Sequence, residues 1–139
     1  METSAQRYKV ILCIDDDPGV LGMLRRVLHG GPYQVITASS PWEGAKLAYT
    51  MRPDLILLDM MMPGLNGKDL LAGFRQTLGE VPVVLITGRE SADDAVEAYE
   101  LGAAHYIRKP FENQHLLEVV EFLIGDISDE RREELMARL

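Results

Sequence analysis

Polar and charged residues stand directly after four apolar segments of the sequence, where buried strands are expected to end. In chain order these residues are Asp15, Asp16, Asp17, Asp59, Thr87 and Lys109. In open α/β sheets, the carboxyl ends of parallel strands form the edge at which ligands bind. We therefore predict that acids, a hydroxyl group and a lysine meet at one edge of a sheet.

This set of groups suits phosphoryl transfer with a divalent cation. Clustered carboxylates raise one another's pKa unless a cation neutralises them, and Mg²⁺ prefers oxygen ligands. A carboxylate can attack a phosphorus atom and hold the group as an acyl phosphate. A lysine and a metal ion can neutralise the charge on the phosphoryl oxygens, and a threonine hydroxyl can donate a hydrogen bond to a third oxygen.

Each of these residues also has an ordinary structural explanation when it is taken alone. The acids at 15–17 could form a solvated turn or a helix cap, Thr87 could be a plain strand residue, and Lys109 could be a surface charge. Their joint position at the ends of four different strands favours a functional site over four separate coincidences.

Apolar segments that alternate with helical periodicity must position these groups. The strands are predicted at 8–14, 33–38, 55–58, 81–87 and 105–108. The helices are predicted at 18–29, from 41 to about 52, at 70–78, at 91–100 and at 116–124. Five alternations of strand and helix imply an α/β fold with a doubly wound, five-stranded parallel sheet and helices on both faces.

The composition is typical of one soluble globular domain, with 139 residues, 47% hydrophobic and 26% charged. The formal net charge of -8 disfavours direct binding of nucleic acid and suits a cation or a basic protein surface. No apolar run reaches the length of a membrane span and no signal peptide precedes the first strand, so we expect no membrane partner. The single Cys13 lies in an apolar strand, which predicts a buried thiol in a cytoplasmic protein.

The last part of the chain differs from the rest in its composition. We predict one domain over 8–125, followed by a charged segment over 126–139 that favours a helix. Leu135 and Leu139 stand one turn apart in this segment. One pair of leucines is far short of several heptads, so a solvated helical tail or the start of a linker is favoured over a coiled coil.

The sequence resembles the receiver domain of two-component response regulators, the CheY-like family, over roughly residues 8–124. The matching stretches are 14–18, with three acids and a proline, 53–67, with Asp59 and Pro63-Gly64, 86–88, with Thr87, and 106–111, with Lys109-Pro110. Together, in this order and at these spacings, the stretches are highly specific. The resemblance implies a flavodoxin-like sheet with strand order 2-1-3-4-5.

The same resemblance implies a set of roles at the sheet edge. Asp59 would accept a phosphoryl group from a histidine kinase or a histidine phosphotransfer protein. Asp16 would bind Mg²⁺ directly and Asp15 mainly through water, while Asp59 and the backbone carbonyl of Met61 would complete the protein ligands. Asp17 has no fixed role in the family, and we interpret it as part of a helix start.

Other residues would respond to the phosphoryl group. Lys109 would pair with it, Thr87 would move to donate a hydrogen bond to it, and Tyr106 would turn inward behind Thr87. Pro110 would follow a cis peptide bond. The result would be a changed surface on the fourth helix, fifth strand and fifth helix, for an output partner or output domain that the sequence does not identify.

Two residues would control the lifetime of the phosphoryl group if the receiver geometry holds. Hydrolysis needs a water molecule opposite the attacking oxygen of Asp59, and Met61 and Arg89 would flank that approach. Neither side chain is a carboxylate or an amide that could orient water. We therefore predict slow self-dephosphorylation, with Met61 and Arg89 excluding water.

Two alternatives remain open at this point. A phosphatase of the haloacid-dehalogenase type also uses a carboxylate nucleophile, Mg²⁺, a hydroxyl group and a lysine, and Asp15 and Asp17 have its Asp-x-Asp spacing. That motif requires Thr or Val where Gly19 stands, and the short chain has no cap insertion. The other alternative is a degenerate receiver that only binds proteins, against which the complete set of acids, Thr87 and Lys109 argues.

Overall fold

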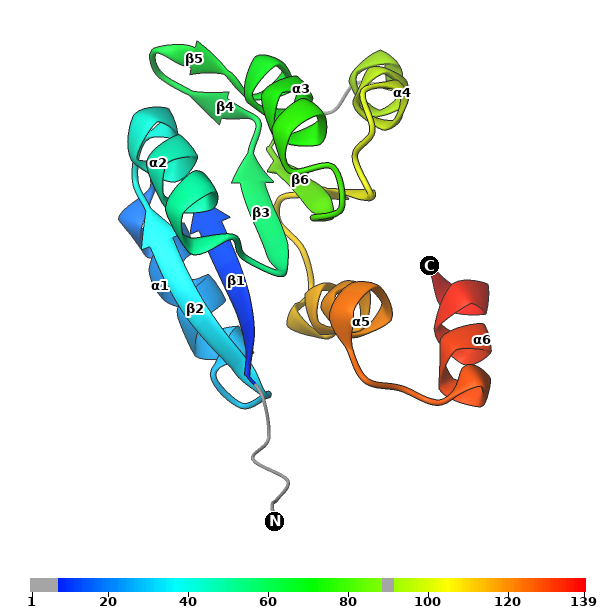
Figure 1. The fold of residues 1–139 in the computed structure, drawn as a ribbon. Coiled ribbons are helices and arrows are strands. Elements are labelled where there is room, and N and C mark those ends of the chain that lie inside the picture. The colour runs from blue at the N-terminus through cyan, green and yellow to red at the C-terminus, as the bar shows by residue number, and fades with distance from the viewer. Residues whose placement is uncertain (1–7, 89–91) are drawn as a thin grey trace.

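Five parallel strands form the centre of the molecule (Figure 1), in a computed structural model that describes residues 8–88 and 92–139. The strands are β1 (Lys9–Ile14), β2 (Tyr33–Ala38), β3 (Leu55–Asp59), β6 (Val83–Thr87) and β7 (His105–Arg108). Their order in the sheet is β2-β1-β3-β6-β7, and every neighbouring pair is parallel. This order confirms the predicted doubly wound α/β fold, because β6 and β7 are the fourth and fifth strands of this sheet along the chain.

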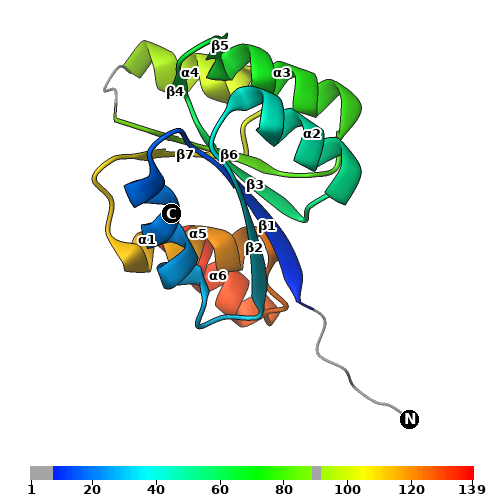
Figure 2. The same cartoon turned by 90° about the vertical axis from the view of Figure 1, so that its left-hand side faces the viewer.

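Helices cover both faces of the sheet, as Figures 1 and 2 show from two sides. One face carries α1 (Pro18–Leu28) and α5 (Asn113–Ile124), and the other carries α2 (Pro41–Met51), α3 (Gly67–Thr77) and α4 (Ala92–Glu100). Among residues 8–88 and 92–139, no helix combines the length and the apolar character that crossing a membrane requires.

Side chains of the central strands alternate between two apolar cores. Leu12 and Leu58 point to the α2–α3 side, whereas Ile11 and Leu57 point to the α1–α5 side. All five residues of β3 are buried, which explains the unbroken aliphatic run in the sequence. Cys13 is also fully buried, and burial raises the pKa of its thiol to about 12, which confirms the predicted structural thiol.

The helix starts follow the capping signals of the sequence. Asp17 precedes Pro18 at the start of α1, and its carboxylate accepts a hydrogen bond from the Gly19 N–H at 2.8 Å. Ser40 caps α2 in the same way by accepting from the Glu43 N–H at 3.1 Å. A proline at the first helical position has no N–H group that would need a partner. The N-terminal ends of α1 and α2 are therefore capped by residues next to them in the sequence.

A short hairpin follows β3, where the sequence predicted only a loop. It consists of β4 (Met61–Met62) and β5 (Leu65–Asn66), which pair antiparallel around Gly64 at φ +93°. Its end brings Gly67, the first residue of α3, so close to β3 that a Cβ there would lie 2.6 Å from the Cα of Met60. The glycine therefore allows the start of α3 to contact the strand end that carries Asp59.

The final helix, α6 (Asp129–Arg138), corrects the expectation of a solvated tail. It lies alongside α5, with its inner face against that helix (Figure 1). Leu135 is completely buried, and Leu139 packs against the core on the α1–α5 side. The segment is helical as predicted, but its leucines serve packing within this chain.

Candidate functional site

The carboxyl ends of the strands bring together the acids and the lysine that the sequence singled out. Carboxylate oxygens of Asp15, Asp16 and Asp59 lie within 4.8 Å of one another. Asp15 and Asp59 are only 2% and 5% exposed, while Asp16 is open to solvent. Two buried carboxylates at the edge of one sheet therefore share a small volume with a third, accessible one.

Lys109 points its amine at both buried carboxylates. Its Nζ lies 2.8 Å from Oδ2 of Asp15 and 3.6 Å from Oδ1 of Asp59. The residue follows β7 directly, and its backbone N–H donates to the carbonyl oxygen of Thr87 at 2.7 Å. The peptide bond between Lys109 and Pro110 is cis, as the family resemblance implied.

The charges at this edge are not balanced. Burial, and next the negative charge of Asp15, raise the pKa of Asp59 from 3.8 to about 6. Burial opposes the charge on Lys109, but its hydrogen bond to Asp15 and the charge of Asp59 outweigh burial, so the pKa of Lys109 is raised. Among the described residues at this edge, one ammonium group thus accompanies three carboxylates, and burial and repulsion disfavour the ionised form of Asp59.

Backbone hydrogen bonds fix the directions of the carboxylates. The Asp17 N–H donates to Oδ1 of Asp15 at 2.9 Å, and the Met61 N–H donates to Oδ1 of Asp59 at 3.3 Å. Asp17 itself caps α1, as we predicted from its position before Pro18. Each buried acid is therefore oriented by the turn that follows its own strand.

The residues at this edge fit a hard divalent cation. They line an open hollow of about 520 Å³, whose walls are Asp15, Asp16, Asp17, Asp59, Met61, Gly88 and Lys109. A site with carboxylate oxygens and access for water has the ligand type that Mg²⁺ prefers. A cation here would also offset the excess of carboxylates over ammonium groups.

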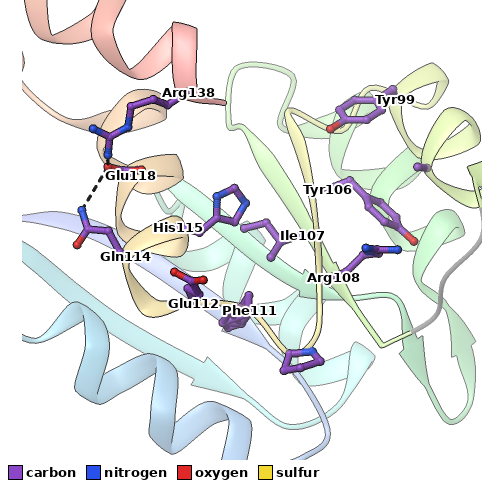
Figure 3. A pocket seen from close by; sticks show the side chains of 12 residues that line it. Tyr99, Tyr106, Ile107, Arg108, Phe111, Glu112, Gln114, His115, Glu118 and Arg138 are labelled. Carbon is purple, nitrogen blue, oxygen red and sulfur yellow. Dashed lines mark hydrogen bonds and ion pairs between the residues drawn. The ribbon is translucent and has the colours of Figure 1, made fainter.

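Of the remaining predicted residues, some line this hollow and others do not. Thr87 ends β6 and is completely buried, and Met61 lies at the hollow's wall with 51% of its surface exposed. Tyr106 is a partly buried residue of β7 that lines a separate cavity with Tyr99 (Figure 3). Its movement behind Thr87 stays a prediction. Arg89 lies outside the described residues.

The hairpin that carries Met61 and the place of Gly88 in the wall were not predicted from the sequence. The sequence does contain a signal for the hairpin, because Pro63-Gly64 between Met61-Met62 and Leu65-Asn66 is a turn sequence.

Comparison with known proteins identifies the family. Residues 11–121 match the model of the response regulator receiver domain. The chain belongs to this family. The family match supports the receiver site and gives no support to the haloacid-dehalogenase-type phosphatase.

Similar proteins agree with this assignment. The DNA-binding response regulator MtrA of Mycolicibacterium smegmatis is 36% identical over 135 residues, which make up 97% of this chain and 58% of the relative. The alkaline phosphatase synthesis transcriptional regulatory protein PhoP of Bacillus subtilis is 40% identical over 103 residues, 74% of this chain and 43% of the relative. The chain thus spans about half the length of these relatives.

A solved structure shows the same fold. The CheY-like response regulator receiver domain protein from Methanospirillum hungatei JF-1 superposes with a TM-score of 0.79 at 26% identity, covering 95% of this chain and 99% of that one. The chain is therefore a receiver domain of two-component signal transduction, the part of a response regulator that acts as a phosphorylation-dependent switch.

Proposed function

We propose that Asp59 accepts the phosphoryl group of this receiver, and that Mg²⁺ is needed for the transfer. The observation that supports this most strongly is the position of Asp59. It is a buried carboxylate at the end of the central strand, with Nζ of Lys109 at 3.6 Å and two further acids within 4.8 Å. Asp15 forms an ion pair with Lys109, and Asp16 is the solvent-exposed acid of the three.

The transfer is a displacement at phosphorus. A carboxylate oxygen of Asp59 forms a bond to phosphorus, while the bond from phosphorus to a nitrogen of the donor histidine breaks and that nitrogen keeps the electron pair. Lys109 neutralises the charge on the phosphoryl oxygens, and Asp15 keeps its amine in place at 2.8 Å. The hydroxyl of Thr87 donates a hydrogen bond to a phosphoryl oxygen once that oxygen is in reach.

Asp15, Asp16, Asp59 and the backbone of Met61 would hold the metal ion. A bound Mg²⁺ would supply positive charge that offsets the repulsion between these carboxylates and the phosphoryl oxygens. The raised pKa of Asp59 supports this need, because in the absence of a cation burial and the charge of Asp15 disfavour its ionised form. Asp16 is the accessible member of the three and the first contact for a hydrated ion.

The partners follow from this chemistry. A histidine kinase or a histidine phosphotransfer protein would supply the phosphoryl group, in the cytoplasm. The surface formed by α4, β7 and α5 would carry the output to a partner or to a further domain. The relatives MtrA and PhoP are named as a DNA-binding response regulator and a transcriptional regulatory protein, and both are longer than this chain.

Labelling with a small phosphodonor tests the proposal. The chain is incubated with Mg²⁺ and acetyl phosphate, trapped with borohydride, and mapped by mass spectrometry. We expect one label, on Asp59, and no label in the Asp59→Asn variant or in the presence of a chelator. Asp17→Asn is the matched control, because Asn also caps helices and this residue lines the same hollow. Uptake of phosphate by Asp59→Asn at the parent rate would refute the assignment.

A further inference from the structure

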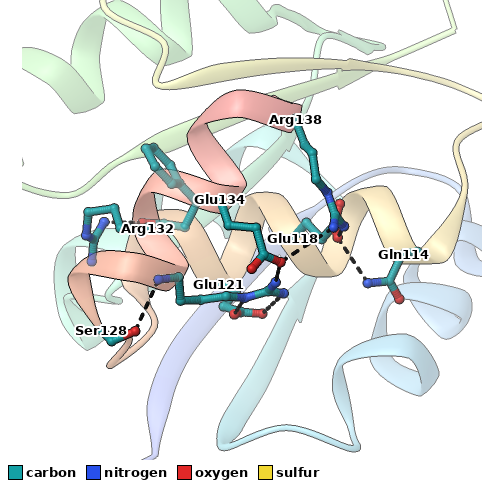
Figure 4. Close-up of polar contacts among 9 residues, drawn as sticks. Gln114, Glu118, Glu121, Ser128, Arg132, Glu134 and Arg138 are labelled. Atoms are coloured by element: carbon teal, nitrogen blue, oxygen red, sulfur yellow. Dashed lines mark hydrogen bonds and ion pairs between the residues drawn. The ribbon is translucent and has the colours of Figure 1, made fainter.

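Three arginines of α6 each bind a different residue of α5. Nε of Arg131 lies 2.6 Å from Oε1 of Glu121, and its Nη2 lies 3.3 Å from Oε2 of the same residue. Nη1 of Arg132 donates to the carbonyl oxygen of Phe122 at 2.8 Å, and its guanidinium lies 5.5 Å from the Phe122 ring centroid. These contacts repeat along the two helices and point to a specific docking geometry (Figure 4).

The third contact involves a buried acid. Arg138 forms an ion pair with Glu118, whose side chain is only 8% exposed (Figure 4). The amide of Gln114 donates to Oε2 of Glu118 at 3.3 Å. Because an unpaired buried carboxylate is costly, the position of Glu118 depends on the arginine that α6 supplies. Glu118, Glu121 and Phe122 stand at spacings of three and four residues, so they form one stripe on α5.

The apolar part of the contact is small. Leu135 is the one completely buried residue within α6, and Met136 beside it is 61% exposed. A helix of ten residues is marginal in water unless its apolar face is packed. Ser128 caps the helix by accepting from the Arg131 N–H at 3.1 Å, but the rest of its support comes from α5. Helix formation and docking of α6 are therefore coupled.

The docked helix borders a large cavity. This cavity of about 1040 Å³ lies between α4, β7 and α5, and Arg138 at the end of α6 contributes to its wall (Figure 3). Tyr99 of α4 and Tyr106 of β7 line the opposite side. A protein that bound across α4, β7 and α5 would meet α6 where it covers the stripe of Glu118, Glu121 and Phe122.

We propose that α6 is a detachable intramolecular cover of the α5 stripe, with the Arg138–Glu118 ion pair as its latch. The docked helix excludes any partner, including a second copy of this chain, from that part of the surface. Release of α6 exposes the stripe and widens the cavity beside it. The significance of the cover rests on the proposed signalling role of the α4–β7–α5 surface, whereas the docking itself is independent of phosphorylation.

Hydrogen exchange of the full chain, without a phosphodonor, tests the latch. We expect Arg138→Glu to speed amide exchange across 129–138 by at least about tenfold, while exchange in β1, β3 and β6 stays at parent rates. Hydroxyl-radical oxidation of Phe122 should rise in the same variant, because Arg132 then no longer covers its ring. Asp59 labelling should remain at parent level, which separates failure of this proposal from failure of the proposed acceptor.

A charge exchange distinguishes the ion pair from a general effect of charge on the helix. Glu118→Arg combined with Arg138→Glu should restore protection of α6, and Glu133→Gln on the exposed side of α6 should leave it unchanged. If the double variant does not fold, Leu135→Ala provides the second measurement and should also release α6. Parent-level protection of 129–138 in both Arg138→Glu and Leu135→Ala, or exchange in the parent at the rate of an unstructured peptide, would overturn the proposal.

Discussion

Within residues 8–88 and 92–139, carboxylates are buried in two regions, and the regions differ in how their charge is balanced. On α5, Glu118 pairs with Arg138 and the neighbouring Glu121 pairs with Arg131. At the carboxyl edge of the sheet, Asp15 and Asp59 share the single amine of Lys109. In the first region each of the two acids of α5 has its own arginine, and both arginines also contact Glu134 of α6. In the described part of the second region, three acids are offset by one lysine.

This difference distinguishes a contact that stabilises the structure from a site that can bind ligands and react. A buried glutamate paired with an exposed arginine holds two helices together, and each group already has its partner. At the sheet edge, burial and the charge of Asp15 raise the pKa of Asp59, and the excess of carboxylates leaves a place for a cation and for a phosphoryl group that brings further ligands. Buried acids alone would have pointed equally to both regions, so the informative quantity is the local surplus of charge.

Removal of the basic side chain in each region should have different effects on phosphorylation. Lys109→Gln removes the group that faces Asp59, and we expect phosphorylation by acetyl phosphate to slow by about 100-fold, because a fixed charge on the transferring group is lost. Arg138→Gln, the matched change on α6, should leave the rate unchanged. The rates are measured from the time course of the phosphorylated species by mass spectrometry. Equal rates in the parent and Lys109→Gln would remove the distinction between the two regions.

Removal of a buried acid should raise the free energy of unfolding in one region and lower it in the other. The pKa of Asp59 in the folded chain, about 6, lies above 3.8, so the folded state binds an extra proton between about pH 4 and pH 6 and loses stability as the pH rises through this window. In metal-free buffer at pH 7, Asp59→Asn should therefore raise the free energy of unfolding by about 3 kcal/mol, and the gain should vanish near pH 4.

Glu118→Gln is the comparison for this measurement. It should lower stability at pH 7, because it removes the partner of Arg138. Urea unfolding at both pH values with a chelator present measures the two variants. A stability gain of Asp59→Asn that is the same at pH 4 and pH 7 would show that packing, and not charge, is responsible.

The sequence predicted the site better than it predicted the α6 contact, for a physical reason. Asp15, Asp59 and Lys109 follow apolar runs, and the topology of a parallel sheet brings all strand ends of this kind to one edge. The order of strands and helices along the chain was enough to predict that these three residues meet. The turns that orient Asp15 and Asp59 by backbone hydrogen bonds could not be placed beforehand, since they depend on the local chain path.

Docking of α6 depends on which side chains of α5 and α6 face each other. The hydrophobic periodicity of the sequence does not determine this pairing. Leu135 and Leu139 recur at one helical turn, but the sequence does not say which surface they contact. Glu118 stands between Leu117 and Val119 in the helical stretch, which was the available signal that α5 has a partner on that side. The hairpin after β3 was missed for a different reason, because its two strands have only two residues each.

The accessible acid should control metal binding. Asp16→Ala should weaken Mg²⁺ binding by at least about tenfold, since even residues that only orient a ligand contribute that much in other sites. The fold should persist because Asp16 is exposed. Amide chemical shifts followed during a Mg²⁺ titration measure the affinity. Glu121→Ala, on α5, is the control that should bind Mg²⁺ as the parent does, and unchanged affinity in Asp16→Ala would contradict its assignment as a ligand.

The smallest expected effect concerns the lifetime of the phosphoryl group. Met61 lies at the wall of the hollow with half of its side chain exposed, and its sulfur and methyl groups cannot orient an attacking water. Met61→Asn introduces an amide at this position, so phosphate loss should become severalfold faster, whereas Met61→Leu should decay as the parent does. The decay is followed after removal of excess phosphodonor at constant Mg²⁺. If the Asn and Leu variants decay alike, the side chain at 61 does not govern the access of water to the phosphoryl group.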